Sequence, residues 1–146
     1  MIPRLGSLAF ALCLAFATPA AQAQGGTYLA DLAKAYPAAY ALWGQTLPYA
    51  IGTLPEWIAR LSGVTTPIRD VTVNGVPMKF GTTCVPHDCG NQAGIMFTPR
   101  QDRIFGVVHL GSKKDLDQTI MIIGKMSNAE YACIRQLLAK PDLAAC

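Results

Sequence analysis

The sequence predicts an α+β domain, a five-stranded antiparallel sheet flanked by N-terminal helices and a C-terminal helix. Apolar residues recur at three- and four-residue steps near both ends of the chain, which is typical of helices with one buried face. Between these ends, short apolar runs alternate with turn signals, and consecutive strands joined by short turns pair antiparallel. Helices that precede and follow such a sheet indicate the α+β class.

The chain begins with a segment that we interpret as a secretion signal, residues 1–23. Arg4 supplies its positive charge, residues 5–16 form an apolar stretch too short to span a bilayer, and Ala21-Gln22-Ala23 is typical of a cleavage site. Because the chain has 146 residues, removing 23 leaves 123. Residues 24–146 are therefore expected to form a single exported domain.

The composition argues against two classes of partner. The chain carries 12 Lys and Arg against 9 Asp and Glu, and loss of Arg4 leaves 11 against 9, a net charge of +2. No basic run with interleaved aromatic residues is present, so a nucleic-acid partner is not expected. No stretch after the signal is apolar and long enough to predict a membrane span.

Helices are predicted in three places. Residues 27–47 carry an apolar stripe, and Pro37 should kink or split this helix because proline lacks the backbone N–H. Thr53–Glu56 has the capping-box pattern, which predicts a short helix that ends at Gly63. A second capping box at Ser127–Glu130 begins the C-terminal helix.

The strands are predicted from apolar alternation and from the turns between them. Asn74-Gly75 is a strong signal for a type I′ hairpin between the first two strands. Pro99–Asp102 is predicted as a turn, and residues 111–115 as a polar loop. The five predicted strands are residues 67–73, 76–83, 93–98, 103–110 and 119–123.

Cysteine usage indicates disulfides. Cys13 leaves with the signal, and an even number of cysteines in an exported chain predicts two disulfide bonds. Three pairings are conceivable among Cys84, Cys89, Cys133 and Cys146. Pairing Cys84 with Cys89 and Cys133 with Cys146 is favoured because each bond closes a local loop. A free Cys146 that cross-links two chains is the alternative, so both a monomer and a homodimer stay open.

The segment from Cys84 to Cys89 is the most distinctive stretch of the chain. A bond between its cysteines would make a small ring that carries Pro86, His87 and Asp88. Pro86 fixes one φ angle, and Gly90-Asn91 after the ring are turn formers. Local chemistry therefore keeps His87 at the surface, where a role in the core is hard to arrange.

Known catalytic patterns are missing from the sequence. There is no G-x-S-x-G elbow and no paired acids at helical spacing, so no catalytic residues are assigned. Cys84, His87 and Cys89, with His109 as a fourth ligand, form a conceivable metal site, but zinc sites usually have closer cysteine pairs. We therefore expect no metal and no cofactor, and we interpret His109 as a partly buried histidine bonded to the backbone.

The motif Cys84-Val-Pro-His-Asp-Cys89 resembles the C-K-P-H-D-C loop of the Ivy family, the periplasmic inhibitors of vertebrate (c-type) lysozyme. The flanking strands are similar too, at Val71–Gly75, Ile95–Phe97 and Ile104–Val108. The resemblance implies that the loop protrudes from an antiparallel sheet and enters the active-site cleft of lysozyme. Such an inhibitor protects peptidoglycan and helps a bacterium to evade host defence.

The resemblance also implies roles for the loop residues. His87 is then the main inhibitory residue and lies against the catalytic carboxylates, Pro86 and Asp88 support it, and the Cys84–Cys89 bond holds the loop. Val85 departs from the family motif, which commonly has lysine there. That loss of charge near an acidic cleft leaves a second target open, the cell's own lytic transglycosylases. A third hypothesis, from another class, is a small exported enzyme or metal-binding protein that uses Cys84, His87 and Cys89.

Overall fold

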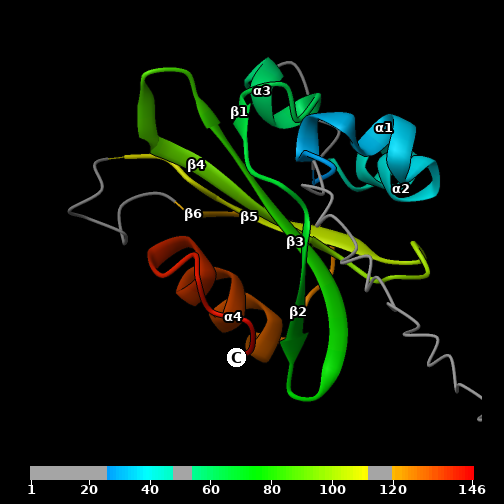
Figure 1. Ribbon diagram of the computed structural model, residues 1–146. Coiled ribbons are helices and arrows are strands. Elements are labelled where there is room, and N and C mark those ends of the chain that lie inside the picture. Colours follow the sequence, from blue (N-terminus) through cyan, green and yellow to red (C-terminus); the bar gives the residue numbers. More distant parts are fainter. Residues whose placement is uncertain (1–25, 48–53, 112–119) are drawn as a thin grey trace, which may run out of the picture.

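The computed structural model describes residues 26–47, 54–111 and 120–146, and these form three layers. A twisted antiparallel sheet lies in the middle, the N-terminal helices cover one face, and the C-terminal helix covers the other (Figure 1). The predicted α+β class is confirmed. The proposed signal at residues 1–23 lies outside the described residues. Among the described helices, none is long and apolar enough to span a membrane.

The first helical region is divided in two, as Pro37 predicts. A 3₁₀ turn (η1, Leu29–Asp31) leads into α1 (Leu32–Ala35), and α2 (Pro37–Thr46) follows with proline at its first position. Tyr36 between them has φ −138° and ψ 65°, outside the helical region, because a residue before proline avoids it.

The short helix α3 (Glu56–Ala59) is present, but the prediction that Gly63 ends it is wrong. The helix stops at Arg60, and Leu61 adopts a positive φ of 53°. Gly63 has a different role, because a Cβ atom there would lie 2.2 Å from the Cys84 carbonyl oxygen. The glycine is needed for close approach to the next strand. Thr53 of the predicted capping box lies outside the described residues.

Within the described residues, the sheet has six strands rather than five. The additional strand is β1, a two-residue segment too short to show any alternation in the sequence. It pairs with one end of β3, and β2 pairs with the other end of the same strand, so the order is β1 and β2, then β3, β4, β5 and β6. The strands are β1 (Val64–Thr65), β2 (Arg69–Val73), β3 (Val76–Val85), β4 (Asp88–Phe97), β5 (Ile104–His109) and β6 (Ile120–Ile123).

Two turns of the sheet are confirmed. Asn74 and Gly75 both have positive φ, 48° and 80°, as the type I′ hairpin between β2 and β3 requires. The predicted turn at Pro99–Asp102 joins β4 to β5. Its Gln101 side chain accepts hydrogen bonds from the backbone N–H groups of Ala38 and Ala39, at 3.2 and 3.4 Å. This turn therefore caps α2. Most of the polar loop predicted at 111–115 lies outside the described residues, as does Thr119.

Alternation along the central strands supplies two hydrophobic cores. On β4, Ile95 and Phe97 face the N-terminal helices, whereas Met96 between them faces the C-terminal helix. The first core contains Trp43, whose indole N–H donates to the Ile58 carbonyl oxygen at 3.1 Å. The second contains Phe80 and the buried face of the C-terminal helix. Because both faces are buried, the pairing register of β3 and β4 is strongly specified.

The C-terminal helix α4 (Asn128–Ala139) begins with the predicted capping box. The Ser127 hydroxyl accepts from the Glu130 N–H at 3.2 Å, and the Glu130 carboxylate accepts from the Ser127 N–H at 2.7 Å. After the helix the chain turns back along β2. Cys146 bonds to Cys133, so it is not free to cross-link a second chain.

Candidate functional site

The candidate site is the tip of the β3–β4 hairpin, which Cys84 and Cys89 close with a disulfide. The Cα atoms of the two cysteines are 5.0 Å apart. The hairpin joins two of the inner strands, β3 and β4, and extends from the end of the sheet in Figure 1. The local pairing that the sequence favours for the four cysteines is the pairing found.

The position of the turn differs from the prediction. Gly90-Asn91 do not form it, and β4 begins at Asp88 rather than at residue 93. Val85 pairs with Asp88, so the turn consists of Pro86 and His87 alone. The sequence pattern is misleading here because glycine and asparagine are the commoner turn residues, whereas proline followed by a positive φ is an equally good solution.

His87 holds an unusual backbone conformation with φ 65°. A left-handed residue with a Cβ atom costs about 1–2 kcal/mol, although histidine tolerates it better than most residues do. The disulfide and the paired strands hold this conformation against that cost. Pro86, His87 and Asp88 are all exposed, whereas Val85 and Cys89 are half-buried. The tip therefore presents an imidazole and a carboxylate on a constrained backbone.

Asn91 braces the tip, which the sequence reasoning missed. Its amide N–H donates to the Asp88 carboxylate at 2.5 Å, and its amide oxygen accepts from the Gly111 N–H at 3.1 Å. The pairing register shifts here, with Cys84 opposite Gln92 but Val85 opposite Asp88, which leaves Cys89–Asn91 unpaired in the ladder. The only signal in the sequence is the general tendency of asparagine side chains to bond nearby backbone.

His109 lies behind the loop at the end of β5 and is 3% exposed. Its Nδ1 atom is 3.0 Å from the Gly90 carbonyl oxygen, which confirms the interpretation of a buried histidine bonded to the backbone. It does not join the cysteines in a metal site, because the disulfide removes both thiolates of Cys84 and Cys89. In the part of the chain that the structure describes, no three His, Cys, Asp or Glu side chains form a metal-binding group.

The hairpin lies within a segment that matches a known family. The family model described as "Inhibitor of vertebrate lysozyme (Ivy)" matches residues 50–118. The resemblance to the Ivy family is confirmed. This Ivy segment contains β1 to β5 and therefore the whole of the disulfide-closed tip. The helix α4 and the Cys133–Cys146 bond lie outside it.

A curated relative gives the same family over a shorter stretch. "Inhibitor of vertebrate lysozyme" from Pseudomonas aeruginosa is 37% identical to this chain over 38 residues. The alignment covers 26% of this chain and 25% of the relative, so the chain spans about a quarter of the length of the curated Ivy protein it matches. The likeness is thus concentrated in one part of the chain.

Proposed function

We propose that this protein is an exported inhibitor of c-type lysozyme that blocks the active-site cleft with the loop between Cys84 and Cys89. One observation carries the proposal. Within the segment that matches Ivy, Pro86, His87 and Asp88 stand exposed at the end of a disulfide-closed hairpin. A pre-shaped tip loses less conformational freedom on docking than a flexible loop, so more of the contact energy appears as affinity.

The chemistry of the tip suits the target. A retaining glycosidase holds two carboxyl groups about 5–5.5 Å apart. A protonated imidazole has two N–H donors, one for each carboxylate. A charge pair at about 4 Å contributes on the order of 4 kcal/mol at an effective dielectric constant of 20, before desolvation. In our proposal the His87 imidazolium supplies this interaction.

The neighbours of His87 support that assignment. Asp88 is engaged by Asn91, which keeps this carboxylate bonded within the loop. No hydrogen bond to the His87 side chain is found among the described residues, so the ring is available to a partner. Pro86 fixes the backbone on the other side of the ring. Asp88 and Pro86 therefore act as supports, and His87 makes the decisive contact.

Val85 favours a second candidate target. The family loop commonly has lysine at this place, whereas here a half-buried valine adds no positive charge. Attraction to an acidic cleft is correspondingly weaker. The same loop therefore also suits the cell's own lytic transglycosylases, muramidases that also carry an acidic residue in a cleft. Export of a single domain, residues 24–146, to the periplasm puts the inhibitor beside either target.

A turbidity assay tests the proposal. Lysis of bacterial cell walls by a c-type lysozyme is followed with and without the purified chain, and again with His87→Ala. The wild type should slow lysis and the variant should do so far less. A lytic transglycosylase assayed with the same two proteins separates the two targets. Inhibition of neither enzyme would contradict the proposed inhibitor function. Equal inhibition by the wild type and by His87→Ala would remove His87 from the mechanism.

A further inference from the structure

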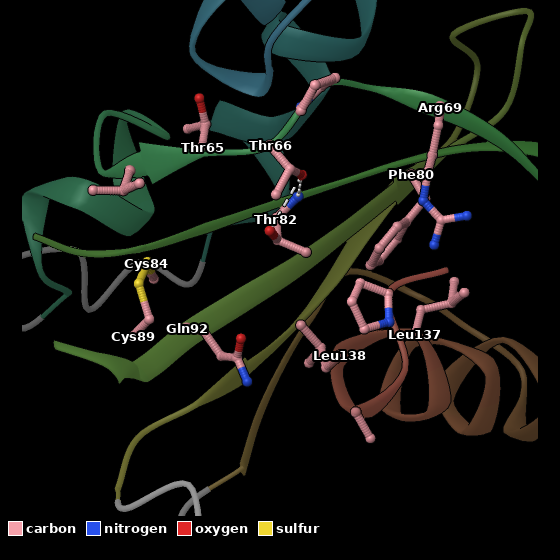
Figure 2. Close-up of a pocket in the computed structure, with 14 residues that line it drawn as sticks. Thr65, Thr66, Arg69, Phe80, Thr82, Cys84, Cys89, Gln92, Leu137 and Leu138 are labelled. Atoms are coloured by element: carbon pink, nitrogen blue, oxygen red, sulfur yellow. Dashed lines mark hydrogen bonds between the residues drawn. A yellow bond between two sulfur atoms is a disulfide. The ribbon is translucent and has the colours of Figure 1, made fainter. Parts of the chain in front are cut away.

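A groove of about 760 Å³ lies between the sheet and the end of α4, apart from the exposed tip at Pro86–Asp88. Figure 2 shows Arg69 and Phe80 at one end, the Cys84–Cys89 disulfide at the other, and Leu137 and Leu138 on the side of the helix. This volume falls within the range of small-molecule sites in proteins. The lining is mainly apolar, which favours an apolar ligand body.

Arg69 is the charged residue at the end of this groove. One of its guanidinium nitrogens, Nη1, donates to the Leu143 carbonyl oxygen, and the guanidinium lies 5.4 Å from the centre of the Phe80 ring. The other, Nη2, is buried and has no hydrogen-bond partner among the described residues. Burial lowers the pKa of Arg69, and Asp142 offsets this only through space. A buried donor without an acceptor is costly. Because Nη2 is covered while other atoms of Arg69 line the groove, the guanidinium turns toward the groove when a ligand there supplies the acceptor.

Two threonines on the wall of the groove, Thr66 and Thr82, bond to each other. The Thr66 N–H donates to the Thr82 carbonyl oxygen at 3.0 Å, and the Thr82 N–H donates to the Thr66 hydroxyl at 2.9 Å. The two hydroxyls are themselves 3.2 Å apart. The backbone N–H groups of this pair are therefore not available to an extended peptide for strand addition. A sugar, which needs several hydrogen-bond partners, finds few.

We propose that this groove binds the anion of a single-chain carboxylic amphiphile. Its carboxylate lies at Arg69 and accepts from the guanidinium, and its acyl chain runs along β3 over Phe80 and Leu138 toward the disulfide. The distance from Phe80 to Cys84 along the strand is about 13 Å at 3.3 Å per residue, which accommodates a chain of medium length. This site is independent of lysozyme inhibition, because it uses none of the exposed residues of the tip.

Titration calorimetry with decanoate, below its micelle concentration, tests the assignment on the purified chain. We expect one saturable site for decanoate and about tenfold weaker binding of decanol, which lacks the charge. Arg69→Gln should weaken decanoate binding about tenfold and leave decanol binding unchanged. Equal affinity for decanoate and decanol, or no saturable binding of decanoate, would overturn the proposal.

A groove-filling variant keeps the test decisive if Arg69→Gln does not fold. Ala139 is exposed at the end of α4 and lines the groove, so Ala139→Trp should occlude it without disturbing either core. Ala132 is exposed on the same helix, about two turns earlier, and does not line the groove. Decanoate binding should be lost in Ala139→Trp and retained in Ala132→Trp. Retention in both variants would place the ligand elsewhere and contradict the site.

Discussion

The two disulfides of this protein close segments that differ in every other respect. Cys84 and Cys89 are five residues apart, and the residues between them are mostly exposed. Cys133 and Cys146 are 13 residues apart, and Cys133 is buried in the second core. The first bond lies at the tip of a hairpin, whereas the second ties the end of the chain to the body of the domain.

The second bond protects a strand edge. The tail that it anchors runs beside β2. The Thr72 N–H donates to the Ala144 carbonyl oxygen at 3.0 Å, and the Cys146 N–H donates to the Thr72 carbonyl oxygen at 2.9 Å. The tail thus covers backbone groups that would otherwise form an exposed edge. The two disulfides therefore have different roles. The Cys133–Cys146 bond stabilises the domain, whereas the Cys84–Cys89 bond presents a site.

The largest effect on stability is expected from Cys133→Ala combined with Cys146→Ala. In the chain-entropy model, opening a loop of this length costs about 3 kcal/mol in the free energy of unfolding. Urea denaturation measures this loss. Inhibition of lysozyme by the folded fraction should not change, because this bond lies in the second core and beside β2, whereas the tip is the turn between β3 and β4. A large loss of inhibition with intact folding would contradict the separate roles of the two disulfides.

His87→Asn should have the largest effect on binding. Loss of a central contact of this kind costs about 2–3 kcal/mol, or about 100-fold in the dissociation constant for lysozyme. Asparagine tolerates positive φ, so the melting temperature should stay close to that of the wild type. His87→Ala is the informative partner, because it should lose the same affinity and about 1 kcal/mol of stability as well. Unchanged affinity in both variants would exclude His87.

Opening the ring closed by Cys84 and Cys89 should have an intermediate effect on both stability and affinity for lysozyme. Cys84→Ala combined with Cys89→Ala should lower the free energy of unfolding by roughly 2 kcal/mol in the chain-entropy model. Affinity for lysozyme should also fall, by about tenfold, because the tip loses its preformed shape. Surface plasmon resonance on the double variant measures this. An affinity equal to that of the wild type would show that the strands alone hold the tip.

Glu130→Gln should lower stability by about 1.5 kcal/mol without affecting inhibition. Burial alone would raise the pKa of Glu130, but hydrogen bonds from the Ser127 backbone and from Arg103 outweigh it and lower the pKa below its usual 4.5. A lowered pKa stabilises the fold above the usual value and ceases to do so as pH falls through the lowered one. The difference between wild type and variant should therefore be full at pH 7 and shrink below about pH 4.5. A difference that does not vary with pH would exclude the carboxylate as its source.

The smallest effect is expected from Asn91→Ala. The variant loses one hydrogen bond to Asp88 and one from the Gly111 backbone, so the tip becomes less well fixed. Affinity for lysozyme should fall by about fivefold, equivalent to about 1 kcal/mol. Stability should change by a similar amount or less. No change in affinity would show that Asp88 needs no support from the neighbouring strand.

Much of this architecture could be predicted from the sequence because its signals are local. Pro37, Asn74-Gly75 and the capping box at Ser127 each act through their own backbone, and all three do what the sequence predicts. Other features depend on contacts that a linear reading does not contain. Gly63 is required by the approach of β3, and β1 exists only through its pairing with that strand.

In the candidate site, too, the local features could be predicted and those that depend on distant contacts could not. The ring of Cys84 and Cys89 could be predicted, because its cysteines are near neighbours and proline restricts the residues between them. The brace through Asn91 could not, because it depends on Gly111, which lies 20 residues later. The groove at Arg69 could not be predicted either, since β2, β3 and α4 all contribute to it.

Competition at the lysozyme active site tests the central claim most directly. An oligomer of N-acetylglucosamine that fills the cleft is titrated into lysozyme, and the affinity of this protein for lysozyme is measured at each concentration. If the loop occupies the cleft, the apparent dissociation constant should rise linearly with the concentration of free sugar, and no ternary complex should form. A dissociation constant that stays unchanged at saturating sugar would contradict the account.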